Sequence, residues 1–163
     1  MKTSIVAALP VVGLLSLAGV SVIAAPNDRQ DQAQERTQDR PGQITFQTLD
    51  NDIQQVTAAQ IWRVRAATTR TEPAGAIVVD YGYDRIYVKD SLEGVVEKIR
   101  GQRELHQFTL PSGAPIYIAP DKITGVSRPI PHQHHQNTNS VIVAREGEQQ
   151  VQESRQSVSE VMK

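Results

Sequence analysis

The chain has 163 residues, a formal net charge of -1 at pH 7 and no cysteine. This charge balance excludes a strongly basic nucleic-acid binder, so no nucleic-acid partner is expected. The lack of cysteine excludes disulfides, thiolate metal sites and cysteine nucleophiles. Because only 4% of the residues are aromatic, a core must be built mainly from aliphatic side chains.

The first 24 residues have the pattern of a secretory signal peptide. Lys2 is followed by an apolar run that ends in the small residues Ala24 and Ala25. We expect cleavage after Ala24 and a periplasmic or secreted protein without a stable membrane span after cleavage. The alternative is an uncleaved membrane anchor, because the run nearly reaches the ~20 residues that cross a bilayer. Pro10 interrupts the run and favours the cleaved signal.

Residues 25–43 are predicted to form a disordered linker. From Pro26 onward the segment combines glutamine with both signs of charge and has no apolar residue larger than alanine. Such a composition buries too little apolar surface to offset the ~1–2 kcal/mol of entropy lost per ordered residue. We interpret it either as a spacer that holds the folded part away from a membrane or as a simple processing tail.

Two similar stretches organise the rest of the sequence. The stretch at residues 88–99, VKDSLEGVVEKI, recurs at residues 151–162 as VQESRQSVSEVM. When the two are aligned, they match at a valine that ends a strand and at a serine suited to cap a helix. Upstream, Phe108 lies 62 positions after Phe46. The sequence therefore predicts two tandem repeats.

Each predicted repeat is a small antiparallel β-meander that ends in a short helix, which makes the fold class α+β and mainly β. The first repeat is expected over residues 44–101 and the second over residues 105–163. Alternating apolar residues mark the strands, and Asp, Asn, Gly and Pro mark the turns. Each unit has about 55 residues, near the lower limit for an independent core. We therefore expect the two units to share an interface through packing of their sheets.

The helix of the first repeat is predicted from its caps and its apolar stripe. Asp90 or Ser91 caps its start, and Gly101 is a stop signal. The stripe at positions i, i+3, i+4 and i+7 consists of Leu92, Val95, Val96 and Ile99. In the second repeat Arg155 and Ser159 replace two of these apolar residues. We expect that helix to fray or to pack at the rim.

One strand carries a more specific expectation. Residues 61–65, IWRVR, alternate if Trp62 and Val64 face inward, which leaves the isoleucine and both arginines on the other side. A single tryptophan in a strand is more typical of a core or a subunit contact than of a sugar-binding platform. The sequence therefore leaves a homo-oligomer open.

The first repeat also carries a pattern known from small bacterial proteins. It consists of Phe-x-x-Leu from Phe46, a turn, an aliphatic strand, Ile-x-x-Val from Ile61, a loop, a β-branched strand and Tyr-Val-Lys-Asp-Ser-Leu-Glu from Tyr87. This pattern resembles the short FlbD-like flagellar proteins and related small uncharacterised bacterial proteins, and the second repeat resembles them more faintly. The resemblance implies small β-rich units with a C-terminal helix, and it implies no catalytic residue.

Residues 131–137, PHQHHQN, hold the strongest candidate for chemistry. Imidazole is a ligand for zinc or copper, and His132, His134 and His135 are close enough in sequence to reach one ion. His106 is a candidate fourth donor. The other interpretation is a solvated polar loop, since a His-rich tract indicates metal binding only by its composition.

Three other polar groupings have structural explanations. Residues 50–52, DND, lack the glycine and distal glutamate of a calcium loop and predict a turn. Asp80 and Asp84 are interpreted as turn residues rather than as a catalytic carboxylate pair. Ser140 and Asp121 lie near the histidines in the sequence, but no nucleophile-elbow or zinc-protease pattern accompanies them.

These features predict an exported, non-enzymatic structural or protein-interaction module of the bacterial cell envelope, with an unidentified envelope protein as its partner. The second interpretation is a periplasmic metal-binding protein that uses His132, His134 and His135. A hydrolase is the third, and no residue pattern in the sequence supports it directly.

Overall fold

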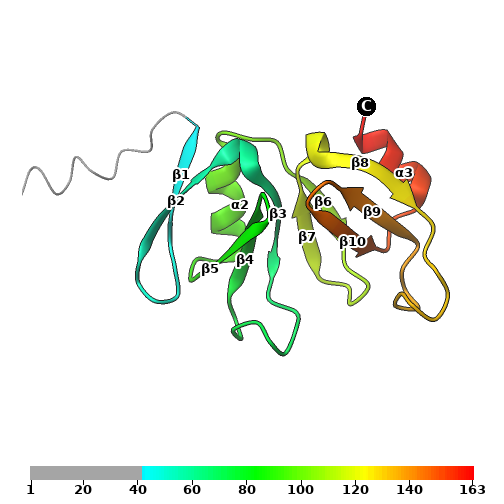
Figure 1. Cartoon of the computed structure of the whole chain (residues 1–163), viewed down its shortest axis with the longest axis horizontal. Coiled ribbons are helices and arrows are strands. Elements are labelled where there is room, and N and C mark those ends of the chain that lie inside the picture. Colours follow the sequence, from blue (N-terminus) through cyan, green and yellow to red (C-terminus); the bar gives the residue numbers. More distant parts are fainter. Residues whose placement is uncertain (1–41) are drawn as a thin grey trace, which may run out of the picture. The chain divides into compact units, whose positions relative to one another are not determined.

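β-strands dominate the part of the chain that the computed structural model describes, residues 42–163 (Figure 1). The first half of this part contains β1 (Gln43–Gln47), β2 (Ile53–Thr57), the 3-10 turn η2 (Ala58–Gln60), β3 (Ile61–Ala66), β4 (Ile77–Tyr81), β5 (Asp84–Val88) and α2 (Leu92–Arg100). The second half contains β6 (His106–Thr109), β7 (Pro115–Ile118), the 3-10 turn η3 (Pro120–Lys122), β8 (Ile123–Ser127), β9 (Ser140–Ala144), β10 (Gly147–Val151) and α3 (Arg155–Val161). The prediction of a mainly β fold with short helices is confirmed.

Two predictions concern the N-terminal residues, the signal peptide and the linker. The signal peptide at residues 1–24 lies outside the described residues, and so does the predicted linker except for its last two residues, Gly42 and Gln43. Gln43 is the first residue of β1. The predicted linker therefore extended at least one residue too far.

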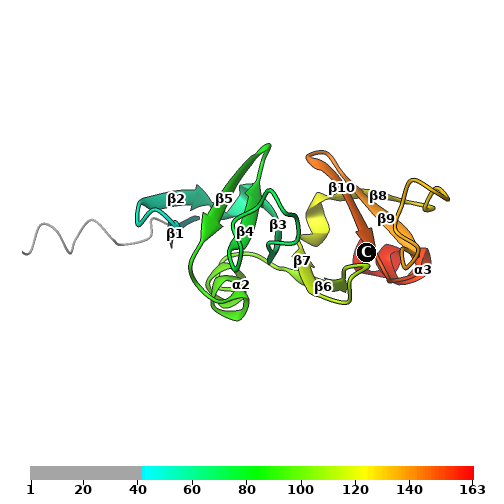
Figure 2. The same ribbon diagram turned by 90° about the horizontal axis from the view of Figure 1, so that it is seen from below.

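The described strands form three antiparallel sheets. One contains β1 and β2, one has the order β5-β4-β3-β7-β6, and one has the order β10-β9-β8. The five-stranded sheet thus joins three strands of the first half to the β6–β7 hairpin of the second half, and β3 and β7 lie side by side in Figures 1 and 2.

The contact between the halves is made by strand edges. Along β3 and β7, Val64 is opposite Tyr117 and Arg65 is opposite Ile116. The N–H of Ala119, just after β7, donates a hydrogen bond to the carbonyl oxygen of Trp62 at 3.0 Å. We expected a shared interface made by packing one sheet on another. The structure instead pairs an edge strand of one half with an edge strand of the other.

Each hairpin is also tied to the last strand of its own half. In the first half Thr48 forms an isolated bridge with Val88, and the Leu49 N–H donates to the Tyr87 carbonyl at 3.1 Å. In the second half the Gln152 N–H donates to the Thr109 carbonyl at 2.9 Å. These contacts place β1 next to the end of β5 and β6 next to the end of β10.

A β-bulge changes the face that β3 presents. The register with β4 shifts between Ile61 and Arg63. Because the bulge adds one residue, Ile61 and Val64 both contribute to the first core, whereas Trp62 does not. The prediction that Ile61 faces away from Val64 was therefore wrong. Strict alternation is the rule for an unbroken strand, and the bulge interrupts it.

Two clusters of buried apolar side chains form the core. The first lies around β1 to β5 and α2, and it includes Phe46, Val64, Val79, Val95 and Ile99. The second lies within the second half and includes Phe108, Ile116, Ile118, Ile142 and Val158. Ala119 of the second half belongs to the first cluster and Tyr117 of β7 packs against it, so the strand pairing brings side chains of the second half to the first core.

The two α-helices of the described part follow their predicted caps. Ser91 is the N-cap of α2, and its hydroxyl accepts a hydrogen bond from the Gly94 N–H; the helix ends at Gly101. The whole predicted apolar stripe of α2 is buried. In α3, which Ser154 caps in the same way, Val158 is the only buried residue. Neither helix is long and apolar enough to cross a membrane.

The shared sheet predicts that both halves unfold together. Phe46 and Phe108 are 0% and 1% exposed, so Phe46→Ala and Phe108→Ala should each cost about 3–5 kcal/mol of the free energy of unfolding. Both variants should shift the same single transition in chemical denaturation followed by Trp62 fluorescence and far-UV circular dichroism. Ile53→Ala, at a side chain that is 69% exposed, is the control and should change stability by about 0.5 kcal/mol or less. Two transitions, each shifted by only one phenylalanine variant, would contradict a shared unfolding unit.

Candidate functional site

The predicted metal ligands lie in the loop between β8 and β9. His132 has a positive φ of 68°, and His134 and His135 follow it in the loop. The Nδ1 atom of His134 accepts the Ile130 N–H at 2.7 Å, and the Nδ1 atom of His135 accepts the Asn137 N–H at 3.2 Å. The structure thus keeps the three histidines in one loop and uses two of the rings to hold the shape of that loop.

These hydrogen bonds determine where the imidazole protons lie. A backbone N–H is always a donor, so Nδ1 of His134 and of His135 must offer a lone pair to it. A neutral imidazole then carries its proton on Nε2 and has no second lone pair for a metal. Within residues 42–163 no three His, Asp or Glu side chains are grouped so as to hold an ion. His106 lies on β6, where its ring packs against Phe108 at 4.9 Å between centroids.

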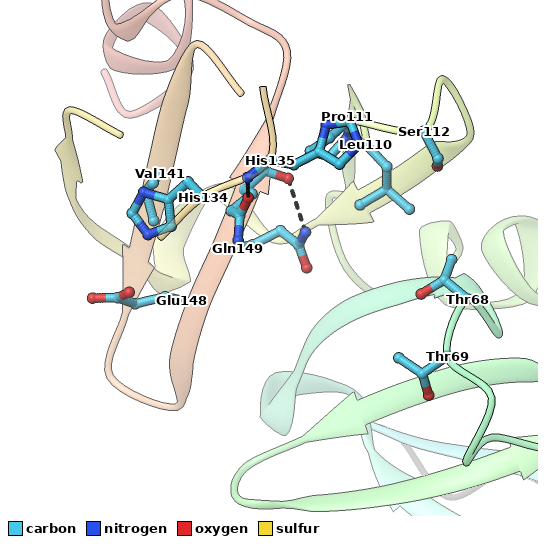
Figure 3. Close-up of a pocket in the computed structure, with 11 residues that line it drawn as sticks. Thr68, Thr69, Leu110, Pro111, Ser112, His134, His135, Val141, Glu148 and Gln149 are labelled. Atoms are coloured by element: carbon cyan, nitrogen blue, oxygen red, sulfur yellow. Dashed lines mark hydrogen bonds between the residues drawn. The ribbon is translucent and has the colours of Figure 1, made fainter. Parts of the chain in front are cut away.

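Gln150 of β10 anchors the histidine loop. The side-chain oxygen of Gln150 accepts hydrogen bonds from the His135 N–H and from the Thr138 hydroxyl, both at 2.9 Å. A cavity of about 520 Å³ opens beside this anchor. Figure 3 shows Thr68 and Thr69, from the loop after β3, facing the histidine loop and Gln149 across this cavity. Its walls therefore come from both halves, and they are mostly neutral.

Five charged side chains form a network beside the β3–β4–β5 sheet. The Glu72 carboxylate accepts hydrogen bonds from both terminal nitrogens of Arg65, at 2.5 and 2.9 Å, and from the Arg85 guanidinium at 3.0 Å. Asp80 binds Arg85 at 2.6 Å and Arg63 at 2.7 Å. The side chains of Glu72 and Asp80 are 3% and 6% exposed, so the two carboxylates are shielded from water and depend on these arginines.

Arg63 carries the network across to the second half. Its Nη1 atom donates to the side-chain oxygen of Gln149 on β10 at 2.7 Å, and its guanidinium lies 4.2 Å from the Trp62 ring centroid. The Trp62 ring reaches Gly147 at the start of β10, where a Cβ would lie 3.8 Å from it. Burial lowers the pKa of Arg63, and Asp80 opposes this effect. The two residues at the bulge therefore make a second contact between the halves, next to the β3–β7 pairing.

One prediction about polar residues needs correction, and the others are compared with the structure beside it. Asp80 is a buried residue of β4 that binds two arginines, so it is a strand residue rather than a turn residue. The Ser140 hydroxyl donates to the Glu153 carbonyl at 2.7 Å, and Asp121 forms an ion pair with Arg103. Their partners are structural, and the structure does not assemble them into a catalytic triad. The turn at residues 50–52 is confirmed, with Asn51 at a φ of 67°.

The arginine–carboxylate network was missed in the sequence, although a signal for it exists. Arg63 is directly opposite Asp80 on β4, and Asp80 is directly opposite Arg85 on β5. Opposite charges at cross-strand positions stabilise a sheet, so an assumed register would have paired these residues. Glu72 lies in a loop, and no period in the sequence predicts its position.

No match to this chain was found in comparisons with protein-family models, with curated proteins and with solved structures. The similarity to FlbD-like proteins therefore remains an interpretation of the residues that carry it.

The network predicts a pH dependence of stability. The hydrogen bond from Arg65, followed by those from the Thr68 and Thr69 N–H groups, holds the pKa of Glu72 far below its ordinary value of 4.5. Because the pKa is lower in the folded state, this stabilisation is complete above the ordinary value and is lost as the pH falls below it. Wild type should therefore lose stability faster than Glu72→Gln between about pH 5 and pH 3, by up to ~1.4 kcal/mol per pH unit.

Urea denaturation at each pH measures this difference. At pH 7 Glu72→Gln should already be less stable than wild type by about 3 kcal/mol, because Arg65 loses its charged partner. Glu104→Gln, at an exposed carboxylate, is the matched control and should keep the slope of wild type. Equal slopes for wild type and Glu72→Gln would show that Glu72 does not provide this pH dependence.

Proposed function

We propose that this chain is an exported, non-enzymatic structural or protein-interaction module of the bacterial cell envelope, built from a tandem duplication. The observation that carries the proposal is the pairing of β3 with β7. Through this pairing a hairpin of one half extends the sheet of the other half. Addition of a strand to a sheet edge is a common mode of protein recognition, in which main-chain hydrogen bonds supply affinity.

The recurrence of local structure supports the duplication. The register of β1 with β2 places Phe46 opposite Gln54, and the register of β6 with β7 places Phe108 opposite Ile116, in both cases 62 positions later. The register shift at Ile61 in β3 has its counterpart at Ile123 in β8. A bulge and a register that recur at one spacing are an expected result of copying one unit.

The use of the buried charges supports a structural rather than a catalytic role. Glu72 and Asp80 each bind arginines within the sheet and its adjoining loop, and Arg63 binds across to β10. These groups stabilise the contact between the halves. Export is proposed from the apolar N-terminal run and from the small residues Ala24 and Ala25.

Site-directed crosslinking in cells tests this function. The full chain is expressed with a photo-crosslinking amino acid in place of Gln55, an exposed residue of β2, and the envelope and cytoplasmic fractions are separated. We expect one or a few discrete crosslinked species, found in the envelope fraction. The same amino acid in place of Glu97, whose side chain is 73% exposed on α2, is the control and should give none. A protein found in the cytoplasmic fraction, or one that forms no crosslink from either position, would contradict the proposal.

A second candidate function is metal binding by the histidine loop. The observation in its favour is that His132, His134 and His135 line one cavity of about 460 Å³. Binding would require His134 and His135 to give up their hydrogen bonds from backbone N–H groups or to turn their rings. For this reason the structure favours the interaction module.

Zinc and copper titrations separate the two candidates. A metal that binds only the folded state raises the midpoint of thermal unfolding in proportion to ln(1 + [L]/Kd). The interaction-module proposal predicts no such rise for the purified protein at micromolar Zn²⁺ or Cu²⁺. A rise that is lost in the triple variant His132→Ala, His134→Ala, His135→Ala, and kept in His106→Ala, would establish metal binding by the loop.

A further inference from the structure

We propose that this protein associates with further copies of itself, by pairing strand β2 of one copy with strand β8 of the next. This pairing rests on the interaction-module function proposed above and specifies its partner. It uses two strand edges that the described residues leave open, and it repeats a pairing that the chain already makes internally.

Six strands lie at the ends of their sheets within residues 42–163, and four of them (β1, β5, β6 and β10) also contact another element at or beside their outer edge. The last strand of each half meets the hairpin of the same half, through Val88 and Thr48 in the first half and through Gln152 and Thr109 in the second. The outer edge of β1 is covered by α2, because Lys98 donates to the Thr45 carbonyl at 3.1 Å. In contrast, β2 pairs with β1 alone and β8 pairs with β9 alone among the described strands.

The N–H and C=O groups of β2 that point away from β1 correspond in position to the groups through which β7 pairs with β3. The Ala58 N–H donates to the Gly42 carbonyl at 2.8 Å. Hydrogen-bonded pairs alternate along an antiparallel ladder, so Gln55 and Thr57 direct their N–H and C=O groups away from β1. Their counterparts 62 positions later are Tyr117 and Ala119. The Ala119 N–H is the group that binds the Trp62 carbonyl on β3.

The strand β8 is the counterpart of β3, which accepts β7. Both strands have a bulge at the same place, so the bulge does not prevent a second neighbour from pairing. Val64 of β3 is 0% exposed next to β7. Its counterpart Val126 of β8 is half-buried, as expected for a strand that lacks this neighbour.

Neither edge carries the charged residues or the proline that commonly protect an edge strand against pairing. Proteins commonly guard exposed edge strands with charged residues, especially lysine, or with proline. The sequence of β2 is IQQVT and that of β8 is ITGVS, and neither contains a charged residue or a proline. Ile53 at the start of β2 is also 69% exposed. Such edges suit a partner that supplies the missing strand.

The internal pairing fixes the register of the external one. The internal pair of Val64 and Tyr117 corresponds to Val126 opposite Gln55 of the next copy. In the same way, the internal pair of Arg65 and Ile116 corresponds to Ser127 opposite Gln54. Each copy offers one β2 and one β8, so the contact is head-to-tail. Head-to-tail contacts close into a ring or continue as a filament.

The first test blocks the β2 edge. Gln55→Pro removes the outward N–H and leaves the ladder to β1 intact, since proline is tolerated on the outer side of an edge strand. Gln55→Ala keeps the N–H and is the matched control. For protein purified from cells that express the full chain, sedimentation velocity should show concentration-dependent oligomers for wild type and Gln55→Ala. For Gln55→Pro we expect the same assembly to need about a tenfold higher concentration or more. A wild type that stays monomeric over the whole range would overturn the self-pairing.

The second test traps the register. The chain has no cysteine, so introduced thiols are the only ones present. Residues 54 and 127 correspond to a non-hydrogen-bonded pair, whose Cα atoms lie at about 4.5 Å, within the range for a disulfide. Gln54→Cys mixed with Ser127→Cys under mild oxidation should give a crosslinked dimer. Gln54→Cys mixed with Tyr83→Cys, at a side chain that is 79% exposed, is the control and should give little. A dominant Gln54→Cys homodimer would overturn the head-to-tail arrangement.

These outcomes also separate the self-pairing from the proposed function. If the crosslinker at Gln55 captures a different envelope protein while the purified chain stays monomeric, the self-pairing is wrong and the interaction module stands. If the crosslinker captures nothing and the purified chain stays monomeric, both are wrong. If the crosslinked species contains two copies of this chain and the cysteine pair forms, both are supported.

Discussion

Strand β3 has a hydrogen-bonded neighbour on each side, and the rest of the structure depends on this double pairing. β4 holds it within the first half, and β7 holds the second half against it. Each half is near the size at which a single apolar core provides little net stability. Pairing through the backbone satisfies N–H and C=O groups that would otherwise meet water at an edge, and it places Val64 and Ala119 in one core. The two halves thus gain stability from a contact that needs few large side chains.

The arginines at this junction show how charge is used inside a β-rich fold. A buried carboxylate is costly unless it is paired and hydrogen-bonded. Asp80 meets this requirement with one arginine from each neighbouring strand, Arg63 and Arg85. Arg63 then uses its Nη1 atom to reach the side chain of Gln149 on β10. One side chain therefore orders both the inside of the first sheet and the approach of the second half.

The local features of this fold were predictable from the sequence. The apolar stripe and caps of α2 are short-range patterns, and the helix lies where they indicate, from Leu92 to Arg100. The short helix that ends the second half was expected for the same reason, and it spans Arg155–Val161. The position of the three histidines in one loop also follows from their spacing. These elements depend on residues a few positions apart, which a periodic pattern records directly.

The features that join distant segments were not predictable in the same way. The bulge at Ile61 depends on the partner strand β4, and the pairing of β3 with β7 joins residues more than 50 positions apart. The role of Glu72 depends on a loop conformation in which it meets two arginines. The hydrogen bonds that occupy His134 and His135 likewise depend on the path of the loop backbone. Composition alone could suggest ligands there, but it could not show that two of the rings already have backbone partners.

The cover that α2 places over β1 has a consequence for solubility. Lys98 of α2 and Gln102, just after this helix, look like ordinary solvated residues, yet they donate to the carbonyl oxygens of Thr45 and Gln43 at 3.1 and 3.2 Å. The Lys98 ammonium also lies 5.6 Å from the centroid of the Phe46 ring. Without these side chains the first hairpin would expose both of its edges, and a hairpin open on both sides is a template for disordered aggregation. Two polar side chains, one on α2 and one just after it, thereby act as gatekeepers, which restrict the growth of the sheet to one direction.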